Sequence, residues 1–151
     1  MPSVLFVCTG NLHRSPMAEY LFRDKIGDTS GWQITSAGTY THNGMHTTSE
    51  VLTVLKEYGI DASSHRSRVI TRRQLMNHNL VLCLAGNHKE ALQAEFPDLK
   101  DRIYLLSEMV GKSTSIDDPI GGPLVEYKAA ASEINEYLTE GFQRILELAG
   151  E

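Results

Sequence analysis

The chain has 151 residues and a net charge of −5, with 41% hydrophobic and 22% charged side chains. These values are typical of one soluble globular domain over residues 1–151, and the acidic balance argues against nucleic-acid or membrane binding. No apolar stretch is long enough to cross a bilayer, and the pattern of a secretory signal is missing. Two cysteines, Cys8 and Cys83, make no disulfide framework, so we expect a cytoplasmic protein.

Apolar runs and amphipathic stretches alternate along the chain, which predicts strands separated by helices. Strands are expected at residues 3–7, 32–36, 80–84 and 103–106. Helices are expected from a Ser15 N-cap to about residue 25, from a capping box at 47–50 to near 59, after a second capping box at 71–74, at 88–96, and as one long tail helix over 127–148. The segment 111–123, rich in Gly and Pro, is expected to be a loop.

This alternation predicts an α/β fold, a three-layer sandwich in which a four-stranded parallel sheet carries helices on both faces. Ligands of such sheets bind at the carboxyl ends of the strands. Two loops are expected at that edge: residues 8–15, here called the nucleophile loop, and residues 111–123, here called the acid loop. Although distant in sequence, the two loops are therefore expected to share one site.

The nucleophile loop has the residues to bind a phosphate-sized anion. Gly10 and Asn11 tolerate positive φ, and the helix that follows begins near Ser15. Its backbone N–H groups can then form an anion nest, whose positive potential favours the reactive thiolate of Cys8. Arg14 can bind two phosphate oxygens at once. The phosphate-binding residues expected here are Thr9, Gly10, Asn11, Leu12, His13, Arg14 and Ser15.

This pattern predicts phosphoryl transfer through a phosphocysteine at Cys8, with Ser15 donating a hydrogen bond to the sulfur. We expect no metal and no other cofactor, because Arg14 and the nest supply the positive charge. A different interpretation makes Cys8 a small buried hydrophobe and Arg14 a surface charge.

The reaction also requires an acid to protonate the leaving group and then to activate water. Asp118 is the candidate, since Pro119 fixes the backbone after it and Gly121 and Gly122 give the loop mobility. Asp117 is a less favoured substitute.

Residues 7–19, Val-Cys-Thr-Gly-Asn-Leu-His-Arg-Ser-Pro-Met-Ala-Glu, closely resemble the signature of low-molecular-weight protein-tyrosine phosphatases. The resemblance extends over essentially the whole chain and implies the catalytic roles of Cys8, Arg14 and Asp118. It also implies that Asn11 bonds with Ser36 and His65, which would hold the loop in shape. The implied substrates are phosphorylated proteins, and the implied inhibitors are phosphate and oxyanions such as orthovanadate.

Three residues are expected to form walls around the substrate: Leu12, Tyr40 and Ile120. Ordinary packing or exposure in loops is the alternative interpretation for each. Many relatives carry a second cysteine at the position of His13, so disulfide protection of Cys8 is expected to be weak or absent. A protonated His13 can instead help to stabilise the Cys8 thiolate, or it can be a simple exposed histidine.

Two features point to different substrates. The run Ile120-Gly121-Gly122 after Asp118-Pro119 resembles bacterial protein-arginine phosphatases, but those enzymes carry threonine where this chain has Leu12. Because leucine suits a phenyl ring and crowds a guanidinium, we expect a protein-tyrosine phosphatase, with arginine phosphatase as the alternative.

Two other functional classes remain. An arsenate reductase of the same fold is less favoured, since its usual relay requires more thiols than Cys8 and Cys83. A non-catalytic phosphate-binding module would typically lose the cysteine or the acid, and this chain has both.

Overall fold

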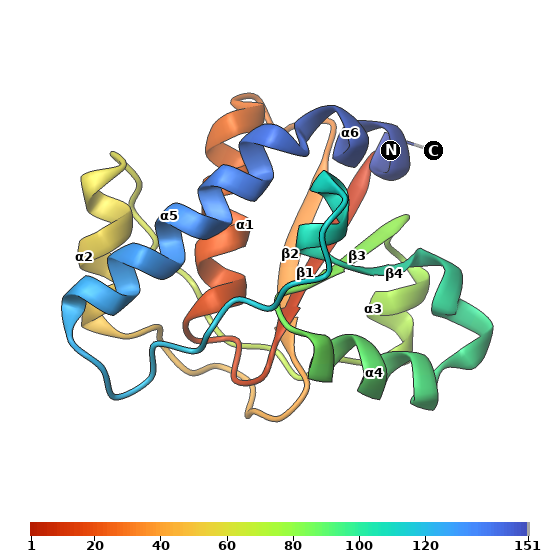
Figure 1. Ribbon diagram of the computed structural model, residues 1–151, viewed down its shortest axis with the longest axis horizontal. Helices are drawn as coiled ribbons and strands as arrows, with labels where there is room; N and C mark the ends of the chain where they lie inside the picture. Colours follow the sequence, from red (N-terminus) through yellow and green to blue (C-terminus); the bar gives the residue numbers. More distant parts are fainter. Residues whose placement is uncertain (151) are drawn as a thin grey trace.

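The computed structural model describes residues 1–150, in which four parallel strands form one sheet with the order β2-β1-β3-β4. The strands are β1 (Ser3–Cys8), β2 (Gln33–Gly38), β3 (Leu80–Cys83) and β4 (Ile103–Leu105). β1 is central and pairs with β2 on one side and β3 on the other. The chain passes from β1 to β2 on one side and then to β3 on the other side, so the strand order reverses at β1. The loops after β1 and β3 leave the sheet at its lower edge in Figure 1.

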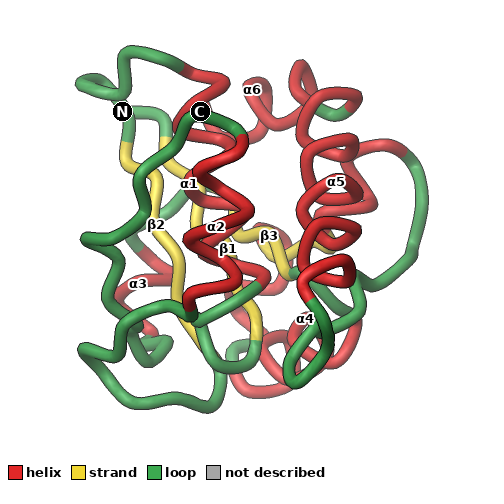
Figure 2. Tube along the Cα trace, turned by 90° about the vertical axis from the view of Figure 1, so that its left-hand side faces the viewer, coloured by secondary structure: helices red, strands yellow, loops and turns green. Residues whose placement is uncertain are grey.

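Helices cover both faces of the sheet, which confirms the predicted three-layer sandwich (Figures 1 and 2). α1 and α5 lie side by side over one face. The helices over that face are α1 (Arg14–Ile26), α2 (Ser49–Glu57), α5 (Leu124–Glu140) and α6 (Phe142–Gly150). α3 (Arg72–Met76) and α4 (Gly86–Glu95) pack on the other, and 3₁₀ helices at Pro97–Arg102 and Leu106–Val110 flank β4.

β1 supplies side chains to both hydrophobic cores, as expected of a strand buried on two faces. Val4, Phe6 and Cys8 belong to the core under α1 and α5. Leu5 and Val7 belong to the core under α3 and α4. Cys8 therefore ends the strand on the face where α1 begins.

The tail is two helices rather than the single predicted one, and the break falls at Gly141. A Cβ atom at Gly141 would lie 2.7 Å from Cβ of Met109 and 2.9 Å from the carbonyl oxygen of Tyr137. Only glycine fits this close approach, and glycine is a poor helix former.

Two predicted helix starts are also shifted. α1 begins at Arg14, and the Ser15 hydroxyl bonds to neighbours in the nucleophile loop instead of capping the helix. The N-cap of α2 is Thr48, whose side chain accepts from Val51 N–H. The capping box of Thr71 is formed as predicted. None of the helices described within residues 1–150 is long and apolar enough to span a bilayer.

Candidate active site

The carbonyl groups of the nucleophile loop are turned outward and bonded to other segments. The carbonyls of Cys8 and Thr9 accept from the backbone N–H groups of Thr39 and Tyr40 at 3.0 and 2.9 Å. The carbonyl of Leu12 accepts from the Thr47 hydroxyl at 2.5 Å. Within residues 1–150, none of the N–H groups from residue 9 to residue 13 donates a hydrogen bond. These donors are therefore available to an anion, as the nest requires.

Asn11 fixes the shape of this loop. It is the one non-glycine residue with positive φ, at 55°, among residues 1–150, and Gly10, which also tolerates positive φ, does not adopt it. The Asn11 amide donates to Ser15 Oγ at 2.7 Å and accepts from the Arg68 backbone N–H at 3.0 Å. Its carbonyl accepts from His65 Nε2 at 2.8 Å. A fully buried side chain thus holds the strained backbone from both sides.

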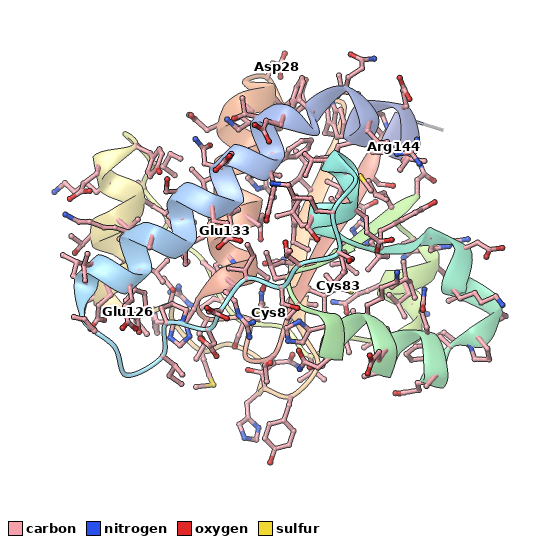
Figure 3. All side chains as sticks on the ribbon, in the orientation of Figure 1. Cys8, Asp28, Cys83, Glu126, Glu133 and Arg144 are labelled. Atoms are coloured by element: carbon pink, nitrogen blue, oxygen red, sulfur yellow. The ribbon has the colours of Figure 1, made fainter. Side chains whose placement is uncertain are left out.

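Cys8 is buried at the end of β1 (Figure 3). Its Sγ lies 2.9 Å from Ser15 Oγ. That hydroxyl oxygen also accepts from the Asn11 amide, which leaves the Ser15 hydrogen able to donate to the sulfur.

Arg14 connects the two loops and is 6% exposed. Its Nη1 donates to the carbonyl of Ile116 at 2.8 Å, and its Nη2 donates to Thr9 Oγ1 at 3.5 Å. The same Nη2 lies 3.6 Å from Asp118 Oδ2. The structure thus places the three predicted catalytic residues together.

Asp118 lies at the surface of this site, with 34% of its side chain exposed. Its Oδ1 accepts from the Ile120 backbone N–H at 3.1 Å and lies 3.4 Å from His13 Nδ1. His13 is 8% exposed, so it is not the exposed histidine considered as an alternative. Burial lowers the pKa of His13, although the nearby Asp118 opposes this shift.

One expected contact of the supporting residues is not formed. The Ser36 hydroxyl donates to Glu19 Oε1 at 2.6 Å rather than bonding with Asn11. Glu19 is a buried carboxylate, also paired with Arg23 at 2.9 Å, and it accepts hydrogen bonds more strongly than an amide.

His88 was missed by the sequence argument. From the first turn of α4, its Nε2 lies 2.7 Å from Thr9 Oγ1. Its Nδ1 is the single buried side-chain N or O atom without a partner among residues 1–150. Burial lowers the pKa of His88 to about 4, so the imidazole is neutral near pH 7. A histidine in the first turn of the helix that follows a buried strand was the available signal.

The expected substrate walls are only partly brought together. Leu12 and Tyr40 line a cavity of about 270 Å³ with Gly10, Thr41, His42 and Met45. Ile120 is outside this lining and is 67% exposed. A second cavity, of about 330 Å³, lies between the acid loop and α5 (Figure 3). Its carboxylates belong to Asp117, Asp118, Glu126 and Glu133.

The Cys83 side chain lies on the opposite face of the sheet from Cys8, although its backbone pairs with that of Val7. It is fully buried in the core under α3 and α4, whereas Cys8 belongs to the opposite core. Burial raises the pKa of the Cys83 thiol, which keeps it protonated and unreactive.

Several known proteins are similar to this chain in sequence and in fold. A protein-arginine-phosphatase of Geobacillus stearothermophilus is 38% identical over 132 residues, 87% of each chain. An arsenate reductase of Staphylococcus aureus is 31% identical over 132 residues, 87% of this chain and 89% of that protein.

Two solved structures superpose closely. A low molecular weight protein tyrosine phosphatase from T. tengcongensis has a TM-score of 0.89 at 39% identity, covering 95% of this chain and 99% of that one. A cysteine-to-serine mutant of the YwlE arginine phosphatase, with a phosphorylated active-site serine, has a TM-score of 0.87 at 30% identity, covering 96% and 95%. Residues 3–148 also match the family described as low molecular weight phosphotyrosine protein phosphatase, and the chain therefore belongs to that family.

Proposed function

We propose that this protein hydrolyses phosphotyrosine in phosphorylated proteins through a phosphocysteine at Cys8. The observation that carries the proposal is the cavity beside the nucleophile loop, where Leu12, Tyr40 and Met45 present mainly apolar surface. An apolar wall next to the phosphate nest suits the phenyl ring of tyrosine and offers little to a charged guanidinium.

In the first step, Cys8 Sγ attacks phosphorus in line, so that an S–P bond forms as the bond to the phenol oxygen breaks. Asp118 gives its proton to that oxygen and becomes a carboxylate. Arg14 and the N–H groups of residues 9 to 15 hold the three remaining oxygens and stabilise their charge. Arg14 Nη2 lies 3.6 Å from Asp118 and 3.5 Å from Thr9 Oγ1, so the guanidinium stands between the acid and the nucleophile loop.

In the second step, water attacks the phosphocysteine while the Asp118 carboxylate takes a proton from that water. The S–P bond breaks, and the Ser15 hydroxyl, 2.9 Å from the sulfur, stabilises the departing thiolate. The phosphorylated active-site serine in the YwlE mutant supports a covalent phosphate at the nucleophile position of a relative. Neither step uses a metal or another cofactor, and phosphate or orthovanadate should bind in the nest.

Supporting residues keep the nest in shape in this scheme. Asn11 and His65 hold the loop backbone through the hydrogen bonds described above. Ser36 acts less directly, because it bonds to Glu19 on α1.

Phosphoarginine is the second candidate substrate. The cavity lined by Glu126, Glu133 and the two aspartates of the acid loop would attract a guanidinium. The relative from Geobacillus stearothermophilus, 38% identical, is named a protein-arginine-phosphatase. We favour tyrosine because Leu12 lies in the nucleophile loop itself, next to the bound phosphate.

Arsenate reduction is less favoured because the second thiol is in the wrong place. Cys83 belongs to the core on the opposite face from Cys8, so the two cannot exchange a disulfide without rearrangement of the sheet. Oxidation of protein thiols on addition of arsenate would contradict this assignment.

The test is kcat/KM on matched peptides that carry phosphotyrosine or phosphoarginine. We expect the wild type to prefer phosphotyrosine by at least about tenfold, and Leu12→Thr to narrow that preference. Leu12→Ile is the matched control, since it keeps an apolar wall and should keep the preference. A wild type that prefers phosphoarginine would mean that the acid loop, not Leu12, sets specificity.

A further inference from the structure

His13 lies in the nucleophile loop, but its side chain is directed to the acid loop. Its Nδ1 is 3.4 Å from Asp118 Oδ1. The edge of the imidazole packs against the Tyr127 ring of α5, with centroids 5.6 Å apart and planes at 79°. The ring is thus wedged between an aromatic side chain and the Asp118 carboxylate.

Among the described residues, only His13 and Arg14 pair with this carboxylate through their side chains. Arg14 is the group proposed to bind phosphate oxygens, and its Nη2 already contacts both Asp118 and Thr9. Once substrate occupies the nest, Arg14 is engaged there. His13 is then the side chain that still touches the acid.

The charged groups around His13 leave it a suitable neutral donor. Burial is the main cause that lowers its pKa, and Arg14 acts in the same direction. Asp118 and Glu50 of α2 oppose the shift. A neutral imidazole that donates from Nδ1 orients a carboxyl group without fixing it in the ionised form, as a cation would. An acid that must be protonated before the first step requires this kind of partner.

We propose that His13 is a positioning residue for the acid, holding the Asp118 carboxyl group over the reaction site while Arg14 binds the phosphoryl group. The inference rests on the proposed role of Asp118. It differs from the expectation that His13 acts on the Cys8 thiolate, because the side-chain partner of the imidazole is the carboxylate of the acid loop.

The first experiment compares His13→Phe with His13→Asn. Phenylalanine keeps a ring against Tyr127 but has no donor, whereas the asparagine amide can occupy the place of Nδ1. On a phosphotyrosine peptide we expect kcat to fall about tenfold in His13→Phe. This loss is smaller than the rate contribution of a general acid, because Asp118 is still present but less well oriented. His13→Asn should recover most of that loss. With 2,4-dinitrophenyl phosphate, whose phenolate departs without a proton, the rate of phosphoenzyme formation should change little in either variant.

The second experiment repeats His13→Phe in an Asp118→Ala background. If His13 acts through Asp118, the added substitution should lower phosphoenzyme formation no further. Equal losses on both substrates, or a full additional loss in Asp118→Ala, would overturn the proposal. Asp118→Ala alone reports separately on the proposed function: if it does not affect poor leaving groups selectively, Asp118 is not the acid. Vanadate affinity and thermal melting check that each variant folds, and His13→Ala replaces His13→Phe if phenylalanine unfolds the loop.

Discussion

The nucleophile loop and the acid loop meet at one edge of the sheet, but they are held in place very differently. The carbonyls of Cys8, Thr9, Asn11 and Leu12 all accept hydrogen bonds from segments outside the loop. In the acid loop, Thr114, Ser115 and Ile116 are bonded to other segments, but Asp118 lies beyond them and is 34% exposed. The phosphate nest is thus preorganised before substrate arrives, whereas the proposed proton donor is held by only a few contacts.

The largest expected effect lies on the rigid side. Cys8→Ala removes the proposed nucleophile, and we expect kcat to fall by at least roughly 10⁴-fold. The backbone N–H groups and Arg14 remain, so phosphate should still bind within a few-fold of its wild-type affinity. Stopped-flow kinetics and calorimetric titration with phosphate measure the two quantities. Loss of phosphate binding as well would show that the nest depends on the thiolate and is not independently formed.

The next effect concerns the acid loop. Asp118→Ala should lower kcat on phosphotyrosine by about 10²–10³-fold, the usual range for a general acid. The loss should increase with the pKa of the leaving phenol, because good leaving groups depart unprotonated. A series of substituted aryl phosphates measures this dependence. A uniform loss across the series would assign Asp118 to binding rather than proton transfer.

Asn11→Ala tests whether the rigidity of the nucleophile loop matters for rate. It removes two side-chain hydrogen bonds and leaves alanine at a φ of 55°. We expect a 10- to 100-fold loss of kcat, similar to other losses of supporting contacts. Asn11→Gly loses the same hydrogen bonds but has no backbone strain. Its kcat should equal that of Asn11→Ala, and it should be more stable than Asn11→Ala by about 1 kcal/mol. Urea unfolding and steady-state kinetics on both variants separate the effect of the lost hydrogen bonds from that of backbone strain. An unchanged kcat in both variants would show that the rigidity of the nucleophile loop does not matter for rate.

The last prediction concerns stability rather than rate, and it tests one buried contact of the nucleophile loop. His88 titrates at a pKa of about 4 in the folded protein and near 6.5 when unfolded. Between these values the unfolded chain binds more protons, so stability falls as pH falls from 6.5 to 4. Glutamine does not titrate, so His88→Gln should not lose this stability. Between pH 7 and pH 4 the free energy of unfolding should therefore fall by up to about 3 kcal/mol more in the wild type than in His88→Gln. Urea unfolding at both pH values measures this, and parallel pH dependence in the two proteins would rule it out.

The sequence was most informative where chemistry is local. The order of strands and helices, the nucleophile loop and the position of Asp118 after β4 all follow from spacing and residue type. Two partners of the loop, Thr47 and His88, could not be predicted, because they come from separate segments. The contact between His65 and Asn11 was implied only by the family resemblance. The direction of the His13 side chain depends on where the acid loop and Tyr127 lie. The break at Gly141 depends on a contact with Met109, which periodicity cannot show.

Ile116 gives the acid loop a fixed point. Its N–H donates to the carbonyl of Leu84, its own carbonyl accepts from Arg14, and it is 2% exposed. Asp118 is only two residues farther along, so its Cα can move no more than roughly 7 Å from that of Ile116 while these bonds persist. Any displacement of Asp118 that keeps these bonds is limited to rotation about the backbone torsions of residue 117. The region from which Asp118 would deliver a proton in the proposed reaction is therefore set by this two-residue tether and not by the length of the loop.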